Sequence, residues 1–262
     1  MKPPSDFRTG IGSFNPLDAP EARLVCCSYA GGSASAYAGW PQRLPPGIEV
    51  LAFELPGRGA RFSEPAFNSL PAAADHLLAL LDGYTDVPFS LYGHSMGAAT
   101  ALELCKRLHD RGKLPERLFV SGCAAPHLPS RRKRRLFDMP HDDLMRELAL
   151  LGGLPKELLA NSRFIDSFLP TIRADMQCRE ECPGDIRDIG IPIHVLTGRD
   201  DDLVTNDDLG EWQRYSSHPL SVRIFEGGHF FINSHRDAVL DHIGRIMARD
   251  PDLDRAPSPG IG

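Results

Sequence analysis

One short turn, residues 93–97 (GHSMG), constrains the fold of this chain more than any other segment. The apolar run 89–92 (FSLY) precedes it, and an Ala-rich, helix-like segment (AATALELCKRL) follows it. A strand that turns so abruptly into a helix strains its central residue, and the residues two before and two after must be small. Gly93 and Gly97 occupy those positions. The pattern predicts a nucleophile elbow, which holds the Ser95 hydroxyl out at a sheet edge above a helix N-terminus.

Short apolar runs alternate with helix-like segments over most of the chain. Strands are predicted at 23–28, 49–53, 89–92, 118–121, 193–197 and 221–225, and helices at 70–81, 96–111, 207–215 and 236–248. This alternation indicates a mainly parallel sheet with helices on both faces, and the turn at Ser95 makes it the α/β-hydrolase fold. We expect a loose arm over 1–22, the hydrolase domain over 23–249 and a disordered tail over 250–262.

Residues 123–191 interrupt the alternation, because they contain no convincing strand although a crossover needs only about a dozen residues. The segments 145–151, 155–160 and 164–174 instead carry Leu and Phe at helical spacing. We expect a helical lid over about residues 130–188, inserted at the carboxyl edge of the sheet. Six apolar residues would line or gate an acyl channel, with ordinary lid core as the alternative: Leu150, Leu151, Leu154, Phe164, Phe168 and Leu169.

Charge and composition exclude several classes of protein. The net charge of −6 argues against nucleic-acid binding, and no apolar run approaches the roughly 20 residues that span a bilayer. The N-terminus has no signal-peptide core, so we expect a cytoplasmic protein without membrane contact. Cys26 and Cys27 would point to opposite faces of a strand, and Cys178 and Cys182 have no partners that complete a zinc site. We therefore expect reduced thiols, no metal and no cofactor.

A serine hydroxyl reacts near neutral pH only when a base accepts its proton. In the predicted fold the acid and then the base follow the nucleophile along the chain. His229, in GGHFF, comes directly after the last predicted strand and before the last helix. His235 and His242 fall beside or on that helix, and His94 is too close to Ser95 in sequence to reach its hydroxyl. His229 is therefore the predicted base.

The acid should follow the predicted strand 193–197, where Asp200, Asp201 and Asp202 stand in a row. Their spacing from Val204 favours Asp201, with Asp200 second, and the remaining carboxylates would be solvated. Buried against His229, the acid would fix the imidazole tautomer and stabilise the imidazolium.

The oxyanion of an acyl-transfer intermediate needs two backbone N–H donors. We expect one donor from Met96, the residue after the nucleophile, and one from the loop YAGGSAS that follows the first clear strand. The glycines of that loop allow close approach, and Ala30 is assigned as the second donor.

Five segments together resemble the stand-alone type II thioesterases that accompany polyketide and non-ribosomal peptide synthases. They are YAGGSAS, ELPGRGARFSEP (54–65), YGHSMGA, TGRDDDLV and GGHFFI, in this order and spacing. The resemblance covers about residues 23–248, and LPGRGAR with YAGGSAS narrows it to thioesterases. The segment LPKELLANSRFIDSFLPTIRAD also resembles the lid of that family.

The resemblance implies hydrolysis of acyl groups from the phosphopantetheine arm of acyl- or peptidyl-carrier proteins, which unblocks mis-primed synthases. It implies Ser95, Asp201 and His229 as the triad and Ala30 and Met96 as oxyanion donors. Since the sequence contains no carrier-protein segment, we expect action in trans. The alternatives are another hydrolase of this fold (a carboxylesterase or a medium-chain fatty acyl thioesterase), an acyltransferase or cyclase, and a non-enzymatic binding protein.

A run of five cations, RRKRR at residues 131–135, opens the expected lid in an acidic protein. Carrier proteins are generally acidic around the serine that bears the arm, so the run is predicted to steer and dock them. The alternative is a solvated basic turn that keeps the lid soluble.

Overall fold

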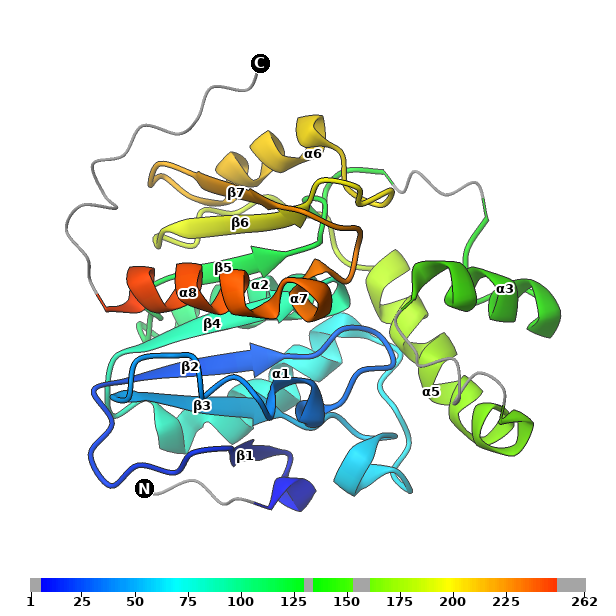
Figure 1. The fold of residues 1–262 in the computed structure, drawn as a ribbon, viewed down its shortest axis with the longest axis horizontal. Coiled ribbons are helices and arrows are strands. Elements are labelled where there is room, and N and C mark those ends of the chain that lie inside the picture. The colour runs from blue at the N-terminus through cyan, green and yellow to red at the C-terminus, as the bar shows by residue number, and fades with distance from the viewer. Residues whose placement is uncertain (1–5, 130–133, 153–160, 249–262) are drawn as a thin grey trace.

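The computed structural model describes residues 6–129, 134–152 and 161–248. Its centre is a seven-stranded sheet in the order β1-β3-β2-β4-β5-β6-β7 (Figure 1). Neighbouring strands run parallel except at the β1–β3 edge, which is antiparallel. The strands are β1 Ile11–Ser13, β2 Ala22–Cys27, β3 Ile48–Phe53, β4 Phe89–His94, β5 Leu118–Ser121, β6 Ile193–Gly198 and β7 Ser221–Phe225. The predicted mainly parallel sheet is confirmed, and all six predicted strands are present.

The strand β1, which the sequence does not predict, lies in the segment whose composition predicts a loose arm. Ile11 pairs with Phe53 and Ser13 with Leu51, so this segment forms the antiparallel edge of the sheet. The Asn15 side chain extends the pairing, because its amide donates to the Ile48 carbonyl and its oxygen accepts from Val50 N–H. A three-residue strand shows no usable alternation, and the Pro- and Gly-rich surroundings conceal it.

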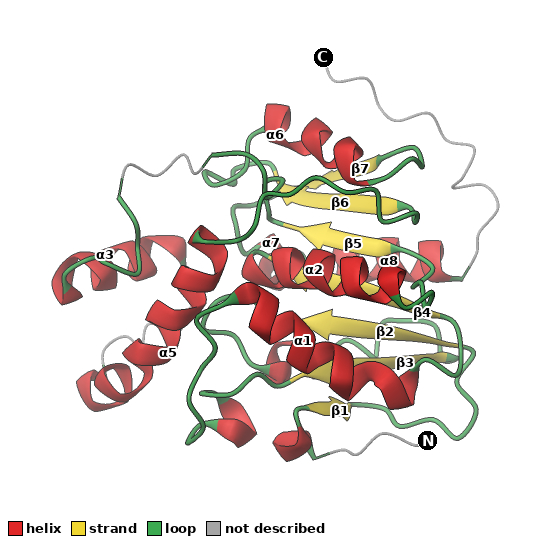
Figure 2. Ribbon diagram, turned by 180° about the vertical axis from the view of Figure 1, so that it is seen from behind, coloured by secondary structure: helices red, strands yellow, loops and turns green. Residues whose placement is uncertain are grey.

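Helices cover both faces of the sheet. In the view of Figure 2, α1 and α2 lie in front of the strands, whereas α8 lies in front of them in the opposite view of Figure 1. Short 3-10 turns complete the layers: η1 Phe7–Thr9, η2 Ala34–Tyr37, η3 Gly59–Arg61, η4 Asp82–Tyr84 and η5 Glu211–Tyr215. The helices are α1 Leu70–Leu81, α2 Met96–Asp110, α3 His141–Leu151, α5 Ser162–Glu180, α6 Asn206–Gly210, α7 Phe231–Ser234 and α8 Arg236–Met247.

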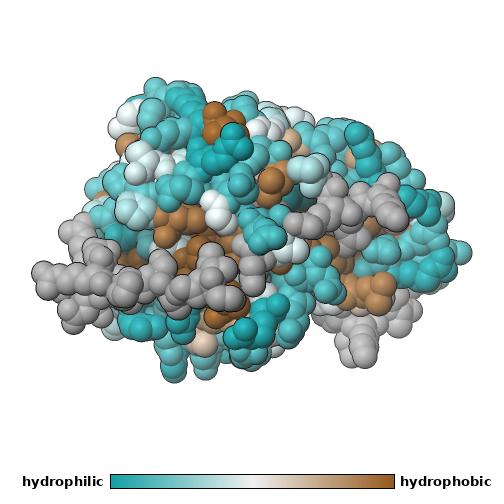
Figure 3. Space-filling model, turned by 90° about the horizontal axis from the view of Figure 1, so that it is seen from above, coloured by the Kyte–Doolittle hydropathy of each residue, from teal (hydrophilic) through white to brown (hydrophobic). Residues whose placement is uncertain are grey.

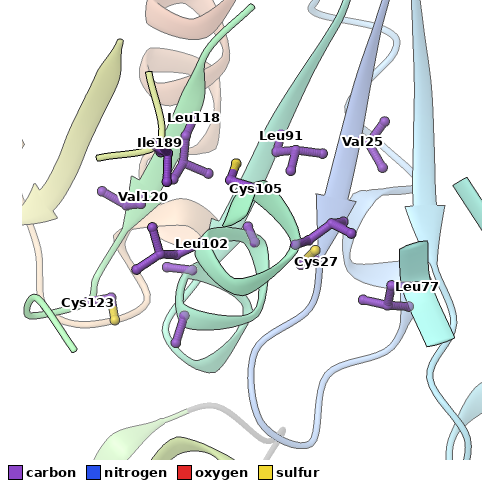
Figure 4. Packing of buried hydrophobic residues seen from close by; sticks show 14 of the residues in the cluster. Val25, Cys27, Leu77, Leu91, Leu102, Cys105, Leu118, Val120, Cys123 and Ile189 are labelled. Carbon is purple, nitrogen blue, oxygen red and sulfur yellow. The ribbon is translucent and has the colours of Figure 1, made fainter. Parts of the chain in front are cut away.

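The core has one layer on each side of the sheet, because successive strand residues point to opposite faces. In β2, Val25 and Cys27 pack toward α1 and α2, while Leu24 and Cys26 pack toward α8. Figure 4 shows the first of these layers, where α2 presents Leu102 and Cys105 to the strands. Because both faces are covered, the strands are apolar almost throughout rather than alternating.

The predicted helical insertion lies beyond the carboxyl ends of the parallel strands, whose arrowheads point toward α5 and α3 (Figure 1). Helix α5 begins at Ser162, where the Asn161 side chain caps it by accepting from Phe164 N–H at 3.1 Å. It continues past Pro170 to Glu180, so it is longer than the predicted 164–174. The helix predicted at 155–160 lies outside the described residues.

On the face shown in Figure 3, hydrophilic side chains predominate and hydrophobic ones occupy small areas between them. Among the described residues, no helix combines the length and the apolar character that crossing a bilayer requires.

Candidate active site

Ser95 lies at the turn between β4 and α2 with φ 55° and ψ −119°. It is the only non-glycine residue with positive φ in the described part of the chain. Its N–H donates to the Ser121 carbonyl of β5 at 2.8 Å, which holds the strained turn against the sheet. A Cβ on Gly93 would lie 2.1 Å from the Gly97 carbonyl oxygen, and one on Gly97 would lie 2.1 Å from the Cys27 carbonyl oxygen. The turn therefore requires both glycines, as the sequence predicts.

A histidine and a carboxylate meet beside this turn. His229 Nδ1 lies 2.9 Å from Asp201 Oδ2, and the two side chains are 8% and 0% exposed. Asp201 Oδ1 also accepts from Leu203 N–H at 3.0 Å, so both carboxylate oxygens have partners. With its proton on Nδ1 and directed at Asp201, the imidazole leaves Nε2 as the basic nitrogen. Asp200 and Asp202 are exposed, whereas the buried Asp201 contacts His229.

Backbone contacts between the loops after β6 and β7 bring this pair together. Arg199 N–H donates to the Phe225 carbonyl at 2.8 Å, and Asp200 N–H donates to the Gly227 carbonyl at 3.0 Å. The approach is so close that a Cβ on Gly198 would lie 2.4 Å from the carbonyl oxygens of the facing glycines. The carboxyl ends of two neighbouring parallel strands thus place the acid and the histidine side by side.

A cavity of about 810 Å³ collects the predicted site residues. Ser95, Asp201 and His229 border it together with Ala30 and Met96, and its volume lies within the roughly 300–1,000 Å³ of small-molecule sites. The lid and the loops after β2, β5 and β6 supply most of the remaining wall, which includes Tyr29, Gly31, Cys123, Leu128, Leu136, Glu147, Leu148, Ile172, Met176, Arg179, Glu180 and Leu203.

The apolar lid residues predicted for an acyl channel divide into three groups. Leu150 and Leu151 border the cavity, and Leu154 lies outside the described residues. Phe164, Phe168 and Leu169 do not border it and instead pack in the core of the lid. Helical spacing identifies a buried face of α5 but not which of its residues face the cavity. Ile172 and Met176 of α5 border the cavity, and so do Leu136 and Leu148 from the segment before it.

Met96 and Ala30, the residues predicted to donate to an oxyanion, both border the cavity. Met96 is the first residue of α2, so its N–H has no acceptor within the helix. The helix dipole adds a partial positive charge at this end. Ala30 lies in the turn in which Gly32 N–H donates to the Tyr29 carbonyl at 2.8 Å, and Gly31 has a φ of 72°.

His94, inside the elbow, is fully buried beneath His229, with 4.9 Å between the ring centroids. Burial, together with the nearby His229, holds the pKa of His94 well below its usual range, so the ring stays neutral. Its Nδ1 lies 3.0 Å from Ser121 Oγ. Because the His94 ring is neutral, it packs against His229 without electrostatic repulsion of a proton bound to His229. The sequence pattern excludes His94 as the base but does not predict this packing contact.

Two cysteines border the cavity, Cys123 and Cys182, and burial makes both thiols poor nucleophiles, raising the pKa of Cys182 to about 12. Burial raises the pKa of Cys123, which borders the cavity, so its thiol stays protonated near neutral pH. Burial also raises the pKa of Cys27 to about 12, and the six cysteines, all within the described residues, are free thiols.

Of the basic run at 131–135, the structure describes Arg134 and Arg135. Both are more than half exposed, and they pair with Asp143 at 3.4 Å and with Glu181 at 3.1 Å. Exposed pairs of this kind contribute about 0–1 kcal/mol to stability. The rest of the run lies outside the described residues.

The mainly parallel sheet, the helices on both faces, the inserted lid and the strained serine turn after β4 together define the α/β-hydrolase fold. The predicted fold class is confirmed. The chain belongs to the thioesterase family, because residues 22–247 match the thioesterase domain. Membership in this family makes it a hydrolase that acts on thioesters.

Relatives agree with this assignment. The chain is 35% identical over 239 residues to a probable cadicidin biosynthesis thioesterase of Streptomyces griseus, and the match covers 90% of this chain and 65% of that protein. The solved structure of RedJ, a thioesterase from the prodiginine pathway of Streptomyces coelicolor, has a TM-score of 0.81 at 34% identity and covers 86% of this chain and 90% of its own.

A third relative is YbtT, described as a type II thioesterase from the yersiniabactin pathway of non-ribosomal peptide and polyketide synthases. Its structure has a TM-score of 0.81 at 30% identity and covers 90% of this chain and 96% of its own. The resemblance to type II thioesterases seen in the sequence is thereby confirmed.

Proposed function

We propose that this protein is a type II thioesterase that releases acyl groups from the phosphopantetheine arm of carrier proteins and so unblocks a polyketide or non-ribosomal peptide synthase. The observation that carries the proposal is the buried Asp201–His229 pair, at 2.9 Å, which borders one cavity with the strained Ser95 in a chain of the thioesterase family. Relatives named for such pathways favour this substrate over a free fatty acyl thioester.

In the proposed reaction, Ser95 Oγ attacks the thioester carbonyl carbon while His229 Nε2 accepts the hydroxyl proton. The carbonyl oxygen becomes an oxyanion that accepts hydrogen bonds from the N–H groups of Met96 and Ala30. When the tetrahedral intermediate collapses, the carbon–sulfur bond breaks and His229 returns the proton to the departing sulfur. The arm leaves as a thiol, and the acyl group remains on Ser95 as an ester.

The second half of the reaction repeats the first with water. His229 accepts a proton from the water that attacks the ester, the same two donors bind the oxyanion, and the proton passes to Ser95 Oγ as the carboxylic acid departs. The burial of Asp201 strengthens its attraction for the imidazolium in both halves, because little solvent screens the pair.

The proposed partner is a separate carrier protein, which presents the arm at the cavity between the sheet edge and the lid. The cavity of about 810 Å³ has room for an acyl group and the end of the arm. The basic run at 131–135 lies in the lid segment, and we assign it to the docking of an acidic carrier surface.

Intact-protein mass spectrometry of acyl-loaded carrier proteins tests the proposal. The wild-type protein should convert each acyl form to the free phosphopantetheine form, while Ser95→Ala should leave the acyl mass unchanged. A matched series of simple oxygen esters supplies the comparison. Rapid hydrolysis of those esters with no release from carrier proteins would overturn the proposal in favour of a carboxylesterase.

A further inference from the structure

A buried ion pair joins the lid to the LPGRGAR motif, which lies more than 100 residues earlier in the chain. Arg58 comes from LPGRGAR and Asp175 from the lid helix α5, and both side chains are 2% exposed. The contact is bidentate, with Nη2 to Oδ1 at 2.7 Å and Nη1 to Oδ2 at 2.8 Å. Such a fork of parallel charge-assisted hydrogen bonds fixes the relative orientation of both side chains.

The same pair holds the loop that carries Ala30. Asp175 Oδ2 accepts from Gly31 N–H at 2.7 Å, and Arg58 Nη1 donates to the Gly32 carbonyl at 3.2 Å. The peptide plane of Gly31 joins that of Ala30 at a single Cα atom. Anchoring Gly31 N–H on the lid side therefore restricts the direction in which the neighbouring Ala30 N–H points toward the cavity.

The lid helix α5 is also attached by hydrogen bonds that do not involve Arg58 or Asp175. Thr171, one turn earlier on α5, donates to the Gly57 carbonyl at 3.0 Å and so ties the same helix to the LPGRGAR loop. That bond makes no contact with the loop at 29–35. What distinguishes Asp175 is that one oxygen serves both the guanidinium and Gly31 N–H.

We propose that Arg58 and Asp175 are positioning residues for the oxyanion hole. They orient the Ala30 N–H and make its orientation depend on α5 being seated over the sheet edge. The inference rests on the proposed function, in which Ala30 supplies the second donor. It gives LPGRGAR and YAGGSAS a common role, since the first holds the second in place.

The test is Asp175→Asn, because the amide NH₂ group cannot accept from the guanidinium and faces one of its N–H groups in either orientation, so the bidentate contact that holds Asp175 beside Gly31 is lost. With a small acyl thioester such as an N-acetylcysteamine ester, kcat should fall about 10- to 100-fold, toward the loss of one oxyanion donor, while KM changes little. Labelling of Ser95 by a fluorophosphonate, whose phosphoryl oxygen occupies the same hole, should slow by a similar factor.

A matched control exists at the other end of the sheet. Glu49, at the start of β3, is fully buried and pairs with the equally buried Arg23 at 2.8 Å. Glu49→Gln should lower the melting temperature as Asp175→Asn does, yet leave kcat and the labelling rate within about twofold of wild type. Thr171→Val, which removes the hydrogen bond between α5 and the Gly57 carbonyl, should behave like this control.

Wild-type kcat and labelling rate in a folded Asp175→Asn protein would overturn the inference. Equal losses in Glu49→Gln would overturn it as well, since the effect would then be general destabilisation. If Asp175→Asn does not fold, Arg58→Lys replaces it, because lysine keeps the charge but loses the bidentate contact. If the wild-type protein labels with fluorophosphonate but hydrolyses no thioester, the proposed function fails, and the labelling rates still decide the inference.

Discussion

Ser95 depends on its backbone as much as on its hydroxyl. Residues held in sparsely populated regions of φ and ψ cost about 1–3 kcal/mol, and here the contact with Ser121 and the packing of the two flanking glycines oppose that cost. Ser95 and Met96 both border the cavity at this turn, and the proposed mechanism uses the hydroxyl of the first and the N–H of the second.

The three neighbouring acids give a sharp prediction at this scale. Asp201→Asn should reduce kcat about 10⁴-fold, because the amide no longer holds the His229 tautomer that leaves Nε2 free. Asp200→Asn and Asp202→Asn, at exposed positions, should change kcat by less than about twofold. Steady-state kinetics on one thioester compares the three variants. A crippled Asp200→Asn beside an active Asp201→Asn would show that the loop presents a different carboxylate.

Single residues differ in how well the sequence predicts them. Ser95, Asp201 and His229 each follow a recognisable strand, and the carboxyl ends of parallel strands meet at one sheet edge, so their proximity can be inferred. The Arg58–Asp175 contact joins residues 117 apart, one of them inside a helix with no strand to place it. No local pattern reports such a pair, and only the packed lid shows it.

At the scale of elements, buried strands were easier to predict than the lid or the edge. The strands β2 to β6 are buried and appear in the sequence as short apolar runs between turns, the pattern that predicts them. The edge strand β7 is partly exposed, and its alternating sequence SVRIF still indicates a strand. The edge strand β1 has three residues and escapes this criterion. The segment after β6, predicted as one helix, divides into α6 and η5 at Gly210–Glu211. The spacing of apolar residues does not indicate where an α-helix changes to a 3-10 helix.

Two buried residues of α5, Met176 and Phe168, predict different mutant behaviour, because only Met176 borders the cavity. Met176→Trp should fill part of the cavity and shift the preferred acyl chain toward shorter lengths by a few carbons, since Met176 borders it. Phe168→Ser should lower the melting temperature but leave the chain-length profile unchanged, because Phe168 packs in the lid core. The profile is kcat/KM across a series of acyl thioesters. A shift in the Phe168 variant and none in the Met176 variant would reverse this assignment.

For the whole molecule, net charge and local charge have opposite signs, with −6 overall and five cations at residues 131–135. Replacing Arg131, Arg132 and Arg134 with Ser should reduce activity on acyl-carrier protein and abolish its dependence on salt. Activity on a small thioester should not change. The physical reason is that salt shortens the Debye length from about 10 Å at 0.1 M to about 3 Å at 1 M.

A control with the same change in net charge replaces three cations that do not border the cavity, namely the exposed Arg43 and Lys113 and the partly exposed Arg187. It should leave both activities at the wild-type level. If both triple variants lost the same activity on acyl-carrier protein, the loss would be due to net charge, and the basic run would have no docking role.

Stability of the whole molecule should depend on pH through buried histidines. Burial lowers the pKa of His194 and of His242 to about 4, whereas an unfolded chain binds these protons below about pH 6.5. Between these values the unfolded state holds more protons, so the free energy of unfolding falls as the pH falls. The slope reaches up to about 1.4 kcal/mol per pH unit for each histidine.

Urea unfolding at several pH values between 4 and 6.5 measures this slope. His242→Gln should reduce it by about one proton, and the exposed His218→Gln is the matched control for the substitution. An unchanged slope in His242→Gln would mean that this side chain is protonated in the folded protein.

The most direct test of the central claim follows the acyl group through one turnover in H₂¹⁸O. The reaction with an acyl-carrier protein is quenched at early times, digested and analysed by mass spectrometry. We predict that the peptide containing Ser95 transiently carries the acyl mass and that the released acid contains one ¹⁸O atom. Ser95→Ala should lose about 10⁶-fold in turnover and show neither signal. An acyl group on any other residue, an acid without ¹⁸O, or a Ser95→Ala protein with a tenth of wild-type turnover would contradict the account.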